Sequence, residues 1–162
     1  MIKNKNPFDY FEAIYCINLD RRTDRWAQVK KEFEKVGIQD RVIRFSAVET
    51  PENGHFWCMA SHRTIIQRAK NAGWKNVLVL EDDIIIRKPI RYFETLFNEL
   101  KNIKYDVGYL WGRLGKMTIC KKKFKNCVIT NGISCTHAII YSENIYDYLL
   151  KNIPYLQGYF FP

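Results

Sequence analysis

Several features that mark other protein classes are missing from this sequence. No apolar stretch is long enough to cross a membrane, and the polar start, Met1 to Tyr10, contains no signal-peptide core. The five cysteines are an odd number and include no C-x-x-C pair, which disfavours zinc ribbons and thioredoxin-like motifs and favours reduced thiols. Neither the dinucleotide fingerprint nor the P-loop motif occurs. These absences predict a cytoplasmic protein without a membrane span.

Acidic residues are in the minority. The 26 lysines and arginines outnumber the 17 aspartates and glutamates, which gives a net charge of +9. Such a charge implies an anionic partner: a nucleotide, a nucleic acid, an acidic glycan or, by peripheral contact, a membrane surface. Apolar residues make up 47% of the 162 positions and aromatic residues 15%, so the composition is globular. The length is that of a single domain, 1–162, with a substantial core.

The most informative stretch is a short apolar run followed by three acids. Residues 77–80 are uniformly apolar, which is typical of a strand buried on both faces in the middle of a parallel sheet. Alternation along the strand places Glu81 and Asp83 on one side and Asp82 on the other. Adjacent carboxylates at the carboxyl end of a strand suit Mg²⁺ or Mn²⁺ with substrate phosphates. The alternative is an acidic strand end that caps a helix or pairs with the basic residues that follow.

A second polar turn follows the first predicted strand, 11–17. It extends from Asn18 to Arg25, contains three arginines, and leads into a helix that Thr23 or Asp20 could cap. Backbone donors, the helix dipole and guanidinium groups converge there, an arrangement that suits a diphosphate. The alternative is that these arginines are ordinary surface charges of a first helical turn.

Two histidines are further candidates. His62 follows Ser61 in a helix expected to begin at Cys58, and neighbours on a helix do not face each other, so the two are not a nucleophile and its base. His62 either positions a ligand or the acidic loop, or packs half-buried against the helix. His137 lies in a predicted strand, 134–141, where it either faces the site or is a satisfied core histidine.

The remaining elements alternate between strands and helices, which predicts an α/β fold. Gly37 and Gly73 are expected to end the first two long helices, and Ser142 to cap the last. Further elements are expected as strands at 41–45 and 105–112, a helix over 90–100, and a basic hairpin around Lys121–Asn126.

These residues together resemble glycosyltransferase family 25, which includes bacterial lipooligosaccharide glycosyltransferases and collagen galactosyltransferases. The order and spacing of the motifs carry the resemblance, and they cover roughly residues 11–150. The motifs are Ile14-Tyr15-Cys16-Ile17-Asn18-Leu19-Asp20-Arg21-Arg22 with Asp24-Arg25-Trp26, Cys58-x-x-Ser61-His62, Val79-Leu80-Glu81-Asp82-Asp83 and Thr136-His137-Ala138.

The resemblance implies a GT-A-like, Rossmann-like three-layer fold with a mostly parallel central sheet. It also implies inverting, Mn²⁺- or Mg²⁺-dependent transfer of a hexose, often galactose, from a UDP-sugar to a glycan or protein hydroxyl. Asp83 and Glu81 would hold the metal, and Asp82 or Asp106 would be the base. The donor would contact Asn18, Leu19, Asp20, Arg21, Arg22, Arg25, Ser61 and His62.

Two departures from the family pattern leave other functions open. Trp57 stands where similar sequences place a glycine, and no acid follows Asp147, so we expect a catalytic domain that lacks its last portion. A catalytically inactive nucleotide-sugar-binding relative is one alternative. A basic nucleic-acid-binding module that uses Lys121 to Lys125 is another, and it ranks last because the positive residues are scattered and form no known binding motif.

Overall fold

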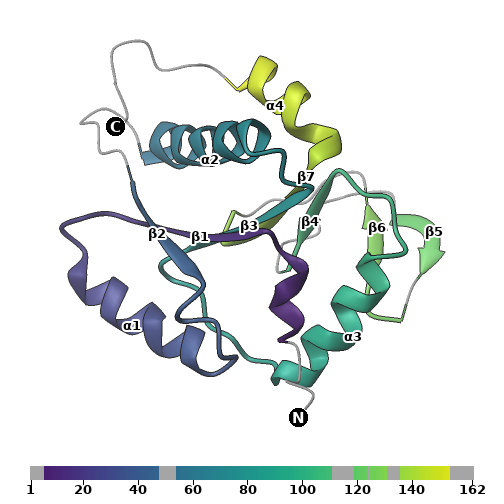
Figure 1. The fold of residues 1–162 in the computed structure, drawn as a ribbon, viewed down its shortest axis with the longest axis horizontal. Coiled ribbons are helices and arrows are strands. Elements are labelled where there is room, and N and C mark those ends of the chain that lie inside the picture. The colour runs from purple at the N-terminus through teal and green to yellow at the C-terminus, as the bar shows by residue number, and fades with distance from the viewer. Residues whose placement is uncertain (1–5, 48–53, 111–118, 124, 131–135, 154–162) are drawn as a thin grey trace.

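A five-stranded sheet forms the centre of the molecule (Figure 1). The computed structural model describes residues 6–47, 54–110, 119–123, 125–130 and 136–153. The strands follow the order β2-β1-β3-β7-β4, with β1, β2 and β3 parallel and β7 antiparallel to both β3 and β4. Four strands therefore share one direction. Their bounds are β1 Ala13–Asn18, β2 Val42–Ser46, β3 Asn76–Glu81, β4 Val107–Tyr109 and β7 Ala138–Ser142.

Helices cover both faces of this sheet (Figure 1). On one face lie α1 (Thr23–Glu34), α3 (Ile90–Leu100) and the short 3-10 helix η1 (Pro7–Tyr10). On the other lie α2 (Gly54–Asn71) and α4 (Tyr146–Asn152), which follows the 3-10 turn η2 (Glu143–Ile145). The expected three-layer α/β fold with a mostly parallel sheet is confirmed.

Strand β3 contributes to the hydrophobic cores on both faces of the sheet. Val77 and Val79 pack with α2 and α4, whereas Leu78 and Leu80 pack with α1 and α3. All four are at most 3% exposed, so the predicted strand buried on both faces is confirmed. Of its two neighbours, β1 runs parallel to it and β7 runs antiparallel. Hydrophobicity reports burial and carries no information on the direction of a partner strand.

Several predicted boundaries differ from the observed ones. The first strand begins at Ala13 instead of residue 11, and α2 begins at Gly54, well before Cys58. His137 lies just before β7 instead of inside it. The N-cap position of α1 is Arg22, and no side chain caps this helix. At the last helical segment, the Ser142 hydroxyl donates to the Tyr105 carbonyl at 2.8 Å instead of capping.

Two predicted helix stops and the basic hairpin are confirmed. Gly37 and Gly73 follow α1 and α2 with φ of 66° and 68°, the left-handed region that favours glycine. Strands β5 (Ile119–Lys123) and β6 (Val128–Thr130) pair antiparallel and form a sheet of their own. Residues 111–118, 124 and 131–135, which complete the predicted strands and hairpin tip, lie outside the described residues.

The described residues include three free thiols, and no described helix could span a membrane. Cys16, Cys58 and Cys127 are free thiols, whereas Cys135 lies outside the described residues. None of the helices in the described ranges combines the length and the hydrophobicity that crossing a bilayer requires.

Candidate functional site

The carboxyl ends of β1 and β3 bring the two polar turns of the sequence together. Ile17 is paired with Glu81 in the parallel ladder, so the turn after β1 and the acids after β3 leave the sheet side by side. The Nδ2 of Asn18, the last residue of β1, donates to Oδ2 of Asp82 at 2.7 Å. Arg25, in the first turns of α1, donates to Oδ1 of the same carboxylate at 3.1 Å. The two turns that the sequence predicts as parts of one site are therefore in direct contact.

Asn18 connects three neighbouring strands at this edge. Its side chain is 1% exposed, and its Nδ2 also donates to the Arg22 carbonyl at 3.1 Å. Its Oδ1 accepts from Nε and Nη2 of Arg44, in β2, at 2.9 and 2.7 Å. One amide thus fixes the turn after β1, the carboxyl end of β2 and the acidic turn after β3.

Several charged residues of the turn after β1 form ion pairs. Arg22 forms an exposed ion pair with Asp24 at 2.7 Å and holds the pKa of that carboxyl well below its usual range. Asp20 pairs with Arg44 at 3.2 Å, and its carboxylate also accepts from the Ser46 hydroxyl. Arg21 is exposed on the same turn.

Arg44 belongs to this region and is absent from the sequence-based candidates. Its guanidinium lies 5.4 Å from the centre of the Trp26 ring, in addition to its contacts with Asn18 and Asp20. The available signal was its place near the end of a predicted strand, because the carboxyl ends of parallel strands meet at one edge. Finding Arg44 would also have required the order of the strands in the sheet, which the sequence alone did not supply.

Three side chains near the acidic turn could together hold a metal ion. One ligand atom each of Glu81, Asp83 and His137 lies within 4.8 Å of the others. Oε2 of Glu81 is 3.3 Å from Nδ1 of His137, and the Glu81 amide donates to the His137 carbonyl at 2.9 Å. The grouping of Glu81 with Asp83, and not with Asp82, is what strand alternation predicts. Two carboxylates and an imidazole are a donor set that suits Mn²⁺.

Helix α2 also contacts Glu81, through Cys58. The Cys58 thiol donates to Oε1 of Glu81 at 3.4 Å, and its sulfur lies 3.6 Å from the Thr136 hydroxyl. Burial raises the pKa of the Cys58 thiol to about 11. Cys58 was part of a sequence motif without an assigned role, because its contact with Glu81 depends on how α2 packs on the sheet.

Ser61 and His62 are both buried, so the interpretation of His62 as half-buried is wrong. His62 is 3% exposed, and burial lowers its pKa to about 4. Its Nδ1 is 3.0 Å from the Tyr141 hydroxyl. Within the described part of the chain, neither Nε2 of His62 nor the fully buried Oγ of Ser61 has a hydrogen-bond partner.

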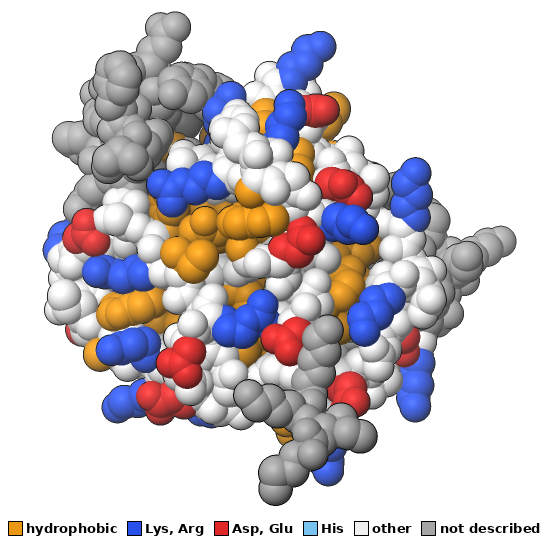
Figure 2. All heavy atoms as spheres, viewed as in Figure 1, with side chains coloured by type: hydrophobic (Ala, Val, Ile, Leu, Met, Phe, Trp, Pro, Cys, Tyr) orange, Lys and Arg blue, Asp and Glu red, His pale blue; other side chains and the backbone are white. Residues whose placement is uncertain are grey.

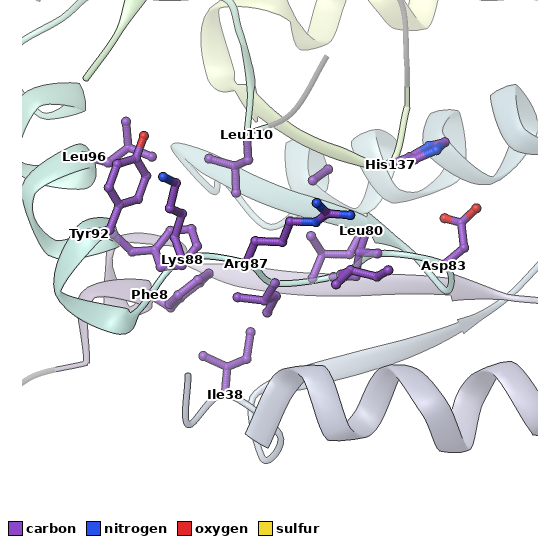
Figure 3. A pocket seen from close by; sticks show the side chains of 15 residues that line it. Phe8, Ile38, Leu80, Asp83, Arg87, Lys88, Tyr92, Leu96, Leu110 and His137 are labelled. Atoms are coloured by element: carbon purple, nitrogen blue, oxygen red, sulfur yellow. The ribbon is translucent and has the colours of Figure 1, made fainter. Parts of the chain in front are cut away.

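A pocket of about 520 Å³ opens beside the acids. Asp83 and His137 lie at one end of it, and Lys88, Tyr92 and Leu96 at the other (Figure 3). Its volume is in the range of small-molecule sites. The pocket is mostly apolar, with Arg87 and Lys88 as its cationic groups. The other lining residues are Phe8, Ile38, Leu80, Ile84, Ile85, Ile86, Phe93, Leu110 and Ala138.

Asp106, a predicted candidate for the base, is not brought to this site. It precedes β4, whose first residue, Val107, is paired with Tyr141, and Tyr141 is paired in turn with Val77 at the start of β3. Asp106 therefore lies at the opposite end of the sheet from the acids. The sequence placed Asp106 near the start of a predicted strand, 105–112, and the direction of that strand decides at which end of the sheet it lies.

No protein-family model matches the chain, and a search of curated proteins finds no match. Among solved structures, the chain is similar to the "crystal structure of a glycosyltransferase involved in the glycosylation of the major capsid of PBCV-1", with a TM-score of 0.45 and 14% identity. The match covers 85% of this chain and 62% of that one, so the chain spans less than two thirds of that protein's structure.

Proposed function

We propose that this protein is a metal-dependent glycosyltransferase that moves a hexose, galactose in the first instance, from a UDP-sugar to a hydroxyl of a glycan or protein. One observation carries the proposal. Ligand atoms of Glu81, Asp83 and His137 cluster within 4.8 Å at the carboxyl end of β3, and the adjoining Asp82 is bound to the turn after β1. A cation site thereby adjoins a turn and a helix amino terminus that suit a diphosphate.

The residues present fit a divalent cation. Glu81, Asp83 and His137 supply two carboxylates and one imidazole, and Asp83 is exposed and able to face a bound substrate. A divalent ion held there would supply positive charge that neutralises the departing diphosphate. We assign Glu81 and Asp83 as the principal ligands and His137 as the third.

The turn from Asn18 to Arg25 is assigned to the diphosphate of the donor. Arg21, Arg22 and Arg25 carry guanidinium groups at this turn, and such groups form charge-assisted hydrogen bonds to phosphate oxygens. Asn18 holds the turn against the acidic segment, so the phosphate-binding and cation-binding parts keep a fixed separation.

Asp82 is assigned to holding the acidic turn in place, and not to removing the proton of the acceptor. Both of its oxygens accept hydrogen bonds, from Asn18 and Arg25, so both are already used in holding the turn against β1 and α1. A folded Asp82→Asn protein without any transfer activity would overturn this assignment and restore Asp82 as the base.

The direct test is transfer of a radiolabelled sugar from UDP-hexoses, with Mn²⁺ present or chelated. We expect turnover only with the metal, and we expect Asp83→Asn to lower it at least about a hundredfold, because the ion would lose a principal ligand. Asp40→Asn is the matched control, since Asp40 is exposed and precedes β2 at the far edge of the sheet. Full metal-dependent turnover in Asp83→Asn would contradict the metal assignment.

Ligand binding is measured separately by thermal unfolding. UDP and Mn²⁺ together should raise the melting temperature more than either alone, since each would bind only the native state. A joint shift without transfer from any UDP-hexose would identify a nucleotide-sugar-binding protein without activity. The absence of both a shift and turnover would overturn the proposed function.

A further inference from the structure

Three side chains of a different chemical kind meet on the α2 side of Glu81. One imidazole nitrogen of His62, Sγ of Cys58 and a carboxylate oxygen of Glu81 lie within 4.8 Å of one another. Cys58 and His62 are four residues apart in α2, so they project from the same face of the helix. The third group comes from the end of β3. The convergence therefore depends on the packing of α2 against the sheet.

The imidazole of His62 is oriented as a metal ligand would be. Its Nδ1 contacts the Tyr141 hydroxyl at 3.0 Å, which fixes the ring and leaves Nε2 as the available nitrogen. This Nε2 is buried and has no hydrogen-bond partner among the described residues, and His62 as a whole is 3% exposed. Buried polar atoms of native proteins are nearly always paired, so an unpaired one indicates an unseen partner. Metal-binding histidines use their second nitrogen in the same way to hold the ring.

The two carboxylate oxygens of Glu81 contact different side chains, Cys58 and His137. Oε1 is 3.4 Å from the Cys58 sulfur, and Oε2 is 3.3 Å from Nδ1 of His137. A simple Cys58–Glu81 hydrogen bond explains the first contact but leaves Nε2 of His62 without a partner. A cation between the three side chains accounts for both.

We propose that Cys58, His62 and Glu81 form a second metal site, selective for Zn²⁺ or a similar thiophilic divalent ion, on the α2 side of the acidic turn. Sulfur, nitrogen and oxygen ligands are the set that Zn²⁺ takes, whereas the oxygen-rich group at Asp83 suits Mn²⁺ or Mg²⁺. Three protein ligands leave a fourth position for water or a bound molecule. Glu81 bridges the two sites, and the thiolate site does not depend on the protein being a glycosyltransferase.

Cobalt absorbance tests this site without any activity measurement. The full chain, freed of metal with a chelator, is titrated with Co²⁺, whose thiolate charge-transfer and visible bands report sulfur ligation and coordination geometry. We expect one equivalent of Co²⁺ to give the thiolate band and Zn²⁺ to abolish it by displacement. Cys58→Ser should remove the band and weaken Zn²⁺ binding at least about tenfold, because it removes a direct ligand. The Cys127→Ser variant is the matched control, since it removes another free, partly buried thiol and should leave the band intact.

Two further variants separate ligation from folding and from the proposed activity. Tyr141→Phe keeps the aromatic packing and removes only the hydroxyl at His62, so we expect Zn²⁺ binding to weaken about tenfold. Asp83→Asn should keep the cobalt bands even where Mn²⁺-dependent transfer is lost. The inference is overturned if the wild-type chain shows no thiolate band or if Cys58→Ser, folded by its melting curve in chelator, retains it.

Discussion

Asn18 shows how much of this site depends on one uncharged side chain. Its amide oxygen accepts from Arg44, and its amide nitrogen donates to Asp82 and to the Arg22 carbonyl. Asn18 is buried, so water cannot replace these partners when the side chain is removed. The residue matters because of what it connects, and its polarity alone does not reveal that role.

The Asn18→Ala change should lower the free energy of unfolding by roughly 2 kcal/mol, because it leaves buried partners without hydrogen bonds. Urea unfolding at neutral pH measures this loss. Asn102→Ala is the control: Asn102 is exposed after α3, its side chain donates to the Asn98 carbonyl, and its replacement should change stability by less than about 0.5 kcal/mol. Equal losses in the two variants would show that Asn18 is not a structural connection.

Asp82→Asn should lower the free energy of unfolding by about 1 kcal/mol. The Asp82 side chain is 10% exposed and loses the charge that binds Arg25, although the partial exposure of Arg25, 41%, limits the effect. Asp24→Asn breaks a surface ion pair with Arg22, in which the Asp24 side chain is 65% exposed, and should cause no measurable change. Parallel urea titrations compare the two, and a larger loss in Asp24→Asn would contradict this ranking.

Sequence reasoning at the level of residues succeeded where the information is local. Strand alternation predicted Glu81 with Asp83 and apart from Asp82, and this grouping is observed, although β3 ends at Glu81 and the turn that follows sets the positions of the other two acids. It missed Cys58 and Arg44, since their contacts depend on which strands and helices become neighbours. A hydrogen bond between segments distant in sequence leaves no pattern in either segment.

At the level of elements, two glycines end the helices that cover opposite faces of the sheet. Gly73 ends α2, the helix that supplies Cys58, Ser61 and His62, and it has a φ of 68°. A Cβ added there would meet no atom within 4 Å, so only the backbone conformation resists substitution. The loss of folding free energy on replacing Gly73 therefore measures the cost of the left-handed conformation, without a contribution from packing.

Gly73→Ala should cost about 1 kcal/mol of stability, whereas Gly73→Asn should cost less, because asparagine tolerates the left-handed region. Thermal or urea unfolding of both variants measures the difference. If alanine were tolerated as well as asparagine, the helix would end without a left-handed residue at this position.

The existence of most elements could be predicted from the sequence, and their pairing could not. Apolar runs and glycine stops located β3 and the ends of α1 and α2. The direction of β7 and the opposite position of Asp106 follow from strand order, which hydrophobicity does not encode. The start of α2, at Gly54, precedes the helical apolar pattern that located this helix, and such patterns fix helix boundaries less well than helix interiors.

At the level of the whole molecule, the sheet separates two hydrophobic cores. Phe97, 1% exposed, packs edge-on against Phe11 with ring centres 4.9 Å apart on the α1 and α3 face. Ile66, fully buried, belongs to the core on the α2 and α4 face. Because β3 contributes side chains to both, the two cores should unfold together.

Phe97→Ala and Ile66→Ala should each lower stability by about 3 kcal/mol or more through cavity formation. In both variants, near- and far-ultraviolet circular dichroism should report a single coincident transition. Tyr148→Ala is the control, since Tyr148 is 63% exposed and should be close to neutral. Two separate transitions in either variant would show that the cores are independent.

The surface charge gives little support to the nucleic-acid alternative. On the face shown in Figure 2, lysine and arginine side chains are spread out, with aspartate, glutamate and apolar side chains between them. A nucleic-acid-binding surface usually concentrates its cations in a patch or stripe. The net charge of +9 is therefore distributed over this face instead of focused on it.

The position of β7 has a consequence for biosynthesis. Strand β3 ends at Glu81, but the strand that covers its free edge begins only at Ala138. While the ribosome makes the intervening residues, the nascent chain presents an open row of backbone donors and acceptors along the edge of a strand with four buried apolar residues, and such edges template aggregation. The segment that closes this edge also delivers His137 to Glu81, so edge closure and assembly of the proposed cation site occur together, after Ala138–Ser142 has been made.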